Sequence, residues 1–460
     1  MANDWRVRVT TRSIVKASGG FTASPRVLAL SNLDLLPASI PVSLFCAYRK
    51  PSAGGFGDVV TAFQAKLPSL LDYFLPLTGR IVADPLSGRP EVHCRNQGAE
   101  LVVGEVRVAL ARLDYSDLGA SLERTGLPVQ YAPDVALSVQ LVSFACGGFA
   151  VAWGSNHSLV DGHSLCIIVN AWSQLARYGT IPAPNHDRSV FRPRAAPSYG
   201  SSIGEVFTPL ESEHLVNALT SESSLVQRTY YVEARDLATL RSQASGAGEH
   251  GATRFEALSA YLWKVFAAVV GASEKSCPMG WWVDGRQRLT SAPYVAAGMR
   301  NYVGNVITYA VAEASVEGIQ RRPLPDVASM VREAIKSTAT EEHFQELTDW
   351  VEEQKDKAAQ YVEAANVGLG SPILAVTSFA SFDIDTDFGF GPAALAVPTA
   401  DGCRRLCCGF VRITAHLGGD DWILTMFVWP TLAAALGSDE HSMFKPLTAE
   451  YLALNQYSRL

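Results

Sequence analysis

The stretch 135–178 limits the possible folds most strongly, because it joins two strand patterns to a helix pattern without a long break. Apolar residues run through 135–144 and 148–156, and Cys146-Gly147-Gly148 supplies a turn between them. Small side chains share one face of the second run: Ala150, Ala152 and Gly154. An amphipathic pattern from Ser164 to Tyr178 then predicts a helix. A hairpin that leads into a helix predicts an α/β fold.

The rest of the chain repeats this alternation of strand and helix patterns. Strand patterns occupy 26–32, 40–48, 228–233, 373–383, 408–415 and 422–429, and helical patterns begin at Asp58, at the Thr253–Glu256 capping box and at 324. With 460 residues, the chain predicts two domains. We expect a first domain over 1–185, a proline-rich crossover linker over 186–225 and a second domain over 226–460.

Composition restricts the function and the location. The chain is 48% apolar, carries a net charge of −7 and lacks a basic stripe, which argues against nucleic-acid binding. Its first residues lack the apolar core of a secretory signal, and no run of 18 apolar residues occurs. We therefore expect a cytoplasmic protein that does not enter a membrane. The cysteines Cys403, Cys407 and Cys408 have no histidine nearby and no CxxC partner, so no metal site is predicted.

The sharpest chemical signal is His157, which is followed by Asp161 and Gly162. It lies between a strand pattern and a helix pattern, where catalytic side chains are often placed. Imidazole is a suitable general base near neutral pH. Gly162 indicates a positive φ or close packing. By itself the spacing is common, and a satisfied histidine at a strand end is the ordinary alternative.

Other nucleophile and metal chemistries lack their motifs. There is no Gly-x-Ser-x-Gly elbow, and Cys166 lies among apolar helix residues, as a core thiol does. His157 and His163 do not have HExxH spacing.

Two further segments are informative. In Asp284-Gly285-Arg286, the Asp-Gly turn allows two interpretations. Arg286 is either a buried bidentate partner for a carboxylate or a residue of a solvent-facing turn. Asp387–Gly391 resembles a tight turn, and no kinase-type catalytic loop accompanies it.

Taken together and in this order, these segments resemble the plant BAHD acyltransferase family. Its HxxxDG and DFGWG motifs correspond to His157–Gly162 and Asp387–Gly391. Its DGR and YFGN segments correspond to Asp284–Arg286 and Tyr302–Asn305. Two N-terminal segments also resemble segments of the family: Leu30–Asp34 and Pro76–Arg80. The resemblance therefore spans nearly the whole chain.

The resemblance implies an α/β fold with two chloramphenicol-acetyltransferase-like domains, each a mixed β-sheet flanked by helices, and a channel between them. It implies transfer of an acyl group, hydroxycinnamoyl or another aromatic acyl, from a coenzyme A thioester to an alcohol or amine. His157 is then the general base, and no acyl-enzyme forms. Acyl-CoA is a co-substrate, and no cofactor is bound permanently. The acceptor is a small molecule and the protein is a monomer. The alternative is a non-catalytic relative that assists fatty-acid elongation.

The resemblance also implies roles for the other matched residues. Asp161 and Gly162 support the histidine turn, Arg286 pairs with Asp161, and a loop with Asp387, Gly389 and Gly391 shapes the donor channel. Thr377, Ser378 and Phe379 form the oxyanion and acyl pocket, and Thr253 and Arg254 contact coenzyme A. Phe379 replaces the usual tryptophan of the family, which removes an indole donor. Gly370 stands where shikimate-using members carry arginine, which disfavours shikimate as the acceptor.

Overall fold

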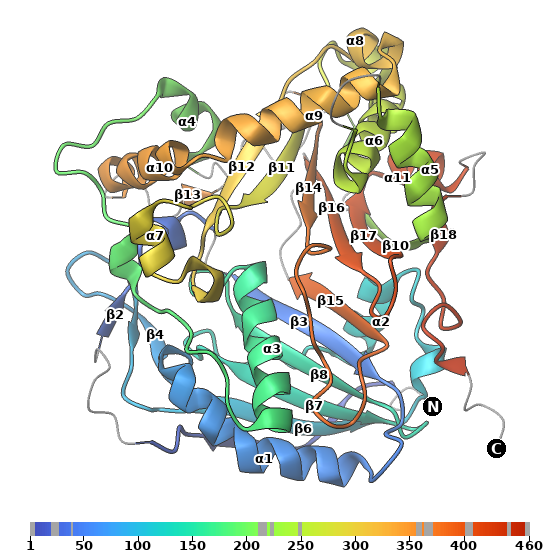
Figure 1. Ribbon diagram of the computed structural model, residues 1–460. Helices are drawn as coiled ribbons and strands as arrows, with labels where there is room; N and C mark the ends of the chain where they lie inside the picture. Colours follow the sequence, from blue (N-terminus) through green and yellow to red (C-terminus); the bar gives the residue numbers. More distant parts are fainter. Residues whose placement is uncertain are drawn as a thin grey trace.

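The computed structural model describes residues 5–19, 27–37, 40–209, 219–220, 225–246, 251–355, 361–362, 371–400, 408–438 and 443–455. Two mixed β-sheets, each covered by helices, dominate the structure (Figure 1). This confirms the expected α/β fold with mixed sheets. Gly370, Cys403 and Cys407 lie outside the described residues, so the expectations that rest on them remain predictions.

The first sheet has six strands. In spatial order they are β1 (Arg8–Val15), β6 (Ala99–Val106), β7 (Ser138–Phe144), β8 (Phe149–Asn156), β3 (Pro41–Tyr48) and β15 (Leu395–Ala400). The predicted hairpin is β7 and β8, which pair antiparallel, whereas β6 and β7 run parallel. Helices α1 (Phe56–Tyr73) and α3 (Gly162–Tyr178) contact each other and bury their apolar faces against this sheet (Figure 1).

The second sheet has seven strands. In spatial order they are β12 (Ile307–Ala312), β11 (Met279–Asp284), β14 (Ile373–Ser378), β16 (Cys408–Ala415), β17 (Trp422–Val428), β10 (Val226–Val232) and β18 (Lys445–Pro446). Its core is shared with α5 (Ala234–Ala244), α6 (Arg254–Val270), α9 (Leu324–Thr338) and α11 (Pro430–Gly437). The capping box that was expected at Thr253 and Glu256 opens α6.

Shorter elements complete the described structure. A small sheet contains β2 (Val27–Ala29), β5 (Pro90–His93) and β4 (Arg80–Ala83), and β9 (Thr208–Pro209) pairs with β13 (Tyr361–Val362). The remaining α-helices are α2 (Leu118–Thr125), α4 (Ser201–Val206), α7 (Ala292–Ala296), α8 (Val316–Arg321) and α10 (Glu341–Gln354). Within the described part of the chain, no helix combines the length and the apolar character that a membrane crossing requires.

Several element bounds differ from the sequence-based expectations for local reasons. Helix α1 begins at Phe56 and not at Asp58, because the Asp58 carboxylate accepts a hydrogen bond from the Gly55 N–H and so lies in the first turn. The strand pattern at 373–383 ends at Ser378. The 324–366 helical region forms two separate helices, α9 and α10, in its described part.

Strand β15 connects the two halves of the chain. Leu395 lies opposite Ala47 and Ala400 opposite Val42, so β15 forms the edge of the first sheet next to β3. Yet 395–400 lies within the range predicted for the second domain, 226–460. The other strands of each main sheet come from 1–185 and from 226–460 respectively. The domain boundaries themselves remain a prediction.

His186, at the start of the expected linker, makes stability dependent on pH. Burial and the nearby Arg188 charge lower its pKa from 6.5 to about 4, although Nε2 lies 3.1 Å from the Tyr73 carbonyl oxygen. Folding therefore favours neutral His186. Above pH 6.5 both states are neutral and the stability is full; as the pH falls towards 4, the unfolded chain binds the proton first and stability is lost.

We expect the free energy of unfolding of the wild type to fall by about 1–2 kcal/mol between pH 7 and pH 5 through this residue alone. His186→Gln should remove that part of the decrease, as measured by urea unfolding at both pH values. His93→Gln is the matched control and should keep it. An unchanged pH dependence in His186→Gln would contradict the assignment.

Candidate active site

His157 follows β8 directly, and its backbone is held on both sides. Its N–H donates to the Ile40 carbonyl at 2.9 Å, and its own carbonyl accepts from Nδ2 of Asn305 at 2.8 Å. The Nδ1 atom is buried and has no hydrogen-bond partner among the described residues. The main chain of His157 is thus fixed, while its imidazole is not committed to a structural hydrogen bond through Nδ1.

Both carboxylate oxygens of Asp161 accept hydrogen bonds from other parts of the structure. Its carboxylate caps α3 by accepting from the Ser164 N–H at 2.8 Å, and it also accepts from the Val306 N–H at 3.1 Å. Arg286 binds the same carboxylate with two nitrogens, Nη1 at 2.8 Å and Nη2 at 3.0 Å. The two side chains are 1% and 0% exposed, so the expected Asp161–Arg286 pair is present and buried.

Arg286 has further partners that keep it charged. It donates to Asp284 at 2.7 Å and to the carbonyl oxygens of Tyr302 at 3.1 Å and Gly304 at 2.7 Å. Burial alone lowers the pKa of Arg286, but the carboxylates of Asp161 and Asp284 raise it above its usual value. Burial likewise raises the pKa of Asp284, and Arg286 together with a hydrogen bond to His163 outweighs this and lowers it to about 2. The carboxylate of Asp284 therefore stays charged beside a charged guanidinium.

A second buried network supports the other side of the histidine turn, and the sequence did not reveal it. Asp34 accepts from the backbone N–H of Asn305 at 2.8 Å and from its Nδ2 at 3.0 Å. It also pairs with Arg188, whose Nε lies 2.7 Å away. Arg188 donates to the Leu159 carbonyl at 3.2 Å and to the carbonyl of Val303. Asn305 and Arg188 therefore hold the His157 and Leu159 carbonyls, and Asp34 orients both.

Gly162 is required for close packing and not for an unusual backbone conformation. A Cβ atom at this position would lie 2.2 Å from Cε1 of Phe379. Since the φ of Gly162 lies outside the left-handed region, the ring of Phe379 is what excludes a side chain. This contact places Phe379, at the end of β14, directly against the first residue of α3.

Gly162→Ala should therefore destabilise the protein by about 1–3 kcal/mol through overpacking. The shorter side chain in Gly162→Ala/Phe379→Leu should recover part of that loss. Thermal unfolding of both variants tests this, with Gly57→Ala as the control, since nothing lies within 4 Å of a Cβ there. Equal melting temperatures for the wild type and Gly162→Ala are incompatible with the contact.

The Asp387–Gly391 loop folds around its own first side chain. Oδ1 of Asp387 accepts from the N–H groups of Gly389 at 2.9 Å and Gly391 at 3.1 Å. Both glycines have positive φ, 103° and 89°, which other residues rarely adopt. Phe388 inserts into the first core, with its ring 5.3–6.3 Å from those of Phe63, Tyr48, Trp172 and Phe149. The loop anchors the chain just before β15.

The remaining expected site residues lie on the second sheet and α6. Thr377 and Ser378 end β14, and Ser378 Oγ accepts from the Ala380 N–H at 3.2 Å. Thr253 caps α6. Arg254 donates to the Asp420 carbonyl at 3.3 Å and lies 3.6 Å from its carboxylate. Thr253 and Arg254 do not line the cavity described next.

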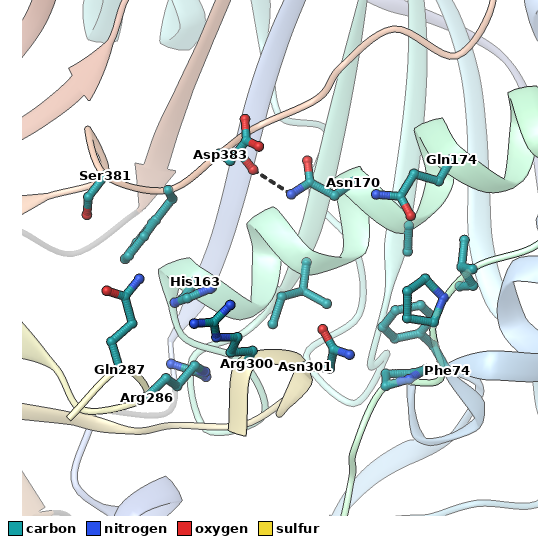
Figure 2. Close-up of a pocket in the computed structure, with 16 residues that line it drawn as sticks. Phe74, His163, Asn170, Gln174, Arg286, Gln287, Arg300, Asn301, Ser381 and Asp383 are labelled. Carbon is teal, nitrogen blue, oxygen red and sulfur yellow. Dashed lines mark hydrogen bonds between the residues drawn. The ribbon is translucent and has the colours of Figure 1, made fainter. Parts of the chain in front are cut away.

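A cavity of about 370 Å³ lies along α3, between the two halves of the chain. His163, Ile167, Asn170 and Gln174 of α3 form one wall, and the opposite wall includes Gln287, Arg300 and Asn301. Figure 2 shows the loop with Ser381 and Asp383 along another side. His157 is not among the lining residues, but His163 follows it in the first turn of α3. In the sequence, only the spacing from His157 draws attention to His163, and that spacing does not match HExxH.

Comparison with known proteins identifies the class. The model of the Transferase family matches residues 5–402, so the chain belongs to this family, that of the BAHD acyltransferases. The omega-hydroxypalmitate O-feruloyl transferase of Arabidopsis thaliana is 27% identical over 385 residues, covering 81% of this chain and 80% of that protein. The hydroxycinnamoyl-CoA:5-hydroxyanthranilate N-hydroxycinnamoyltransferase of Avena sativa is 29% identical over 445 residues, covering 91% and 94%.

A solved structure supports the fold. F. graminearum TRI101, complexed with coenzyme A and deoxynivalenol, superimposes with a TM-score of 0.73 at 16% identity, covering 91% of this chain and 98% of its own. The family expected from the motifs is thus confirmed. The chain is a CoA-dependent acyltransferase, for which acyl-CoA is the co-substrate.

Proposed function

We propose that this protein transfers an aromatic acyl group from its coenzyme A thioester to the hydroxyl or amino group of a small acceptor, with His157 as general base. The observation that carries the mechanism is the arrangement of the histidine turn. Its backbone is held by hydrogen bonds to Ile40 and Asn305. The carboxylate of Asp161 is already occupied by hydrogen bonds from Arg286 and from the N-terminus of α3. The imidazole is therefore the group of this turn that can exchange a proton with a substrate.

The proposed reaction balances without an enzyme-bound acyl group. As the acceptor oxygen or nitrogen attacks the thioester carbonyl carbon, its proton moves to the free imidazole nitrogen of His157. The carbonyl oxygen becomes an oxyanion, to which Thr377 and Ser378 are the candidate donors. When the tetrahedral intermediate collapses, the C–S bond breaks, and the imidazolium returns the proton to the leaving thiolate. His157 is then neutral again, as general base catalysis requires.

The names of the relatives support an aromatic donor but leave the acceptor atom open, since one similar protein is an O-feruloyl and another an N-hydroxycinnamoyl transferase. Thr253 and Arg254 remain the proposed contacts of the coenzyme A phosphates, at the N-terminus of α6. A cytoplasmic monomer remains part of the proposal.

A donor and acceptor panel tests the function. Purified protein is incubated with feruloyl-, caffeoyl- or benzoyl-CoA and with paired alcohol and amine acceptors, and products are identified by mass spectrometry. Free thiol release without a new ester or amide reveals thioester hydrolysis. A protein that binds acyl-CoA but transfers to no acceptor fits the alternative, a non-catalytic partner of fatty-acid elongation.

A further inference from the structure

A single loop separates two cavities of similar size. The first cavity, the one along α3, is bordered on one side by 381–383 (Figure 2), and the same three residues border a second cavity of about 370 Å³. The far wall of the second cavity is the segment 415–419, which leads from β16 towards β17. Of the three shared residues, Ser381 and Asp383 are exposed, and only Phe382 has a bulky side chain. The ring of Phe382 is therefore the main barrier between the two cavities.

The backbone on both sides of Phe382 is fixed. The Phe379 N–H donates to the Ile413 carbonyl at 2.7 Å, and the Phe382 N–H donates to the Phe379 carbonyl at 3.0 Å. On the other side, the Asp383 carbonyl accepts from Nδ2 of Asn170 at 2.5 Å, which ties the loop to α3. Moving the main chain would break these hydrogen bonds, so a passage between the cavities opens most easily through the side chain of Phe382.

The ring of Phe382 has room to turn, whereas the neighbouring ring of Phe379 does not. Phe379 fills the space that a side chain at Gly162 would need. The ring centroid of Phe382 lies 5.6 Å from that of Phe379 and 4.4 Å from that of His163, and Phe382 is only half-buried, with a cavity on either side. A half-buried ring beside empty space can change its rotamer. Both rings lie against the first two residues of α3, directly after the histidine turn.

The second cavity lies on the side of the proposed coenzyme A contacts. Directly after the segment that lines it, the Asp420 carbonyl accepts a hydrogen bond from Arg254 at 3.3 Å. Arg254 is one of the proposed contacts of the coenzyme A phosphates. The first cavity is different, because exposed polar side chains such as Gln287 and Arg300 line it, so water enters it. A thioester that arrives through the second cavity meets this water only past Phe382.

We propose that Phe382 is a specificity-determining residue of the acyl transfer, which decides between the acceptor and water. This rests on the proposed function. In hydrolysis, water attacks the thioester carbonyl carbon, the C–S bond breaks, and a proton of the water passes to the leaving thiolate, giving a carboxylic acid and free coenzyme A. With its ring against His163, Phe382 keeps the water of the first cavity from the thioester. An acceptor that enters displaces this water, and the ring turns to let the acceptor reach the carbonyl.

A thioether analogue tests the barrier without transfer chemistry. S-(4-fluorobenzyl)-coenzyme A carries an aromatic ring but no carbonyl group, so it binds without reacting. The difference in its fluorine-19 chemical shift between H₂O and D₂O measures how much water reaches the bound ring. We expect a small difference in the wild type and a clearly larger one in Phe382→Ala, with Phe382→Leu between them. Phe427→Ala is the matched control, because Phe427 is also half-buried but lines neither cavity.

Benzoyl-CoA without an acceptor tests the consequence for the reaction. Release of the free thiol should be roughly tenfold faster in Phe382→Ala than in the wild type, because water is no longer excluded from the thioester. In the presence of an alcohol or amine acceptor, the ratio of acylated product to free acid should fall in the same variant. Phe427→Ala should hydrolyse benzoyl-CoA at the wild-type rate. Equal hydrolysis by Phe382→Ala and the wild type, or an equal solvent isotope shift, overturns the proposal.

The outcomes separate this inference from the proposed function. If calorimetry shows that the analogue does not bind the wild type, the proposed function fails and this inference fails with it. If the analogue binds but neither its exposure to water nor the hydrolysis depends on Phe382, only the barrier is refuted. If both depend on Phe382 while no acceptor is acylated, the barrier stands and the proposed transfer is refuted.

Discussion

His157→Ala is expected to lower kcat for acyl transfer by roughly 10²–10⁴-fold, the usual contribution of a positioned general base. No other side chain of the turn can take over the proton, because Asp161 is tied to Arg286 and to the N-terminus of α3. The KM values should change little, since the backbone contacts of His157 persist in alanine. Mass-spectrometric product rates with a fixed donor and acceptor measure the effect.

The control for this loss is a histidine outside the site. His93→Ala, which removes a partner of Glu91 in β5, should transfer at the wild-type rate. Both variants should unfold at nearly the same temperature as the wild type. Full activity in His157→Ala would rule out His157 as the general base for any acceptor.

Asp161→Ala is expected to lower the free energy of unfolding by about 3–5 kcal/mol, because it leaves the buried guanidinium of Arg286 without its bidentate partner. The cap of α3 is lost as well. Asp161→Asn keeps an oxygen for the cap and removes the charge, so it should be less damaging than alanine. Urea unfolding followed by circular dichroism gives the comparison.

The matched control is an exposed ion pair. Arg321 and Glu317 pair across one turn of α8 at the surface, and Glu317→Ala should cost no more than about 0.5 kcal/mol. If Asp161→Ala costs as little as Glu317→Ala, the buried pair does not hold the halves together. If it costs several kcal/mol, residual transfer by Asp161→Asn at low temperature should show whether the pair also positions His157.

Local patterns predicted the parts of this site that are contiguous in sequence. The β7–β8 hairpin, the start of α3 and the capping box of α6 follow from alternation, spacing and the capping residues alone. The general-base role proposed for His157 does not follow from its local pattern. It is implied only by the ordered set of family motifs, which also implies that Arg286 is the partner of Asp161.

Other parts of the site depend on contacts that no local pattern encodes. Asp34 and Arg188 are 154 positions apart, and nothing in the sequence around Arg188 distinguishes it from the other arginines of the proline-rich segment. Its burial became visible only when the folded chain placed it beside Asp34. The expected solvent-facing alternative for Arg286 is wrong, because the guanidinium is fully buried.

The pairing of β15 with β3 has a consequence for synthesis. When the first 185 residues have left the ribosome, β3 is a sheet edge made of the apolar strand Pro41–Tyr48, and its partner 395–400 has not yet been translated. Unpaired apolar edges recruit other chains. We therefore expect nascent chains to be prone to aggregation until 395–400 has been synthesised and can pair with β3. Expressing the N-terminal half alone should give aggregates, which co-expression of the C-terminal half can rescue by supplying the missing strand.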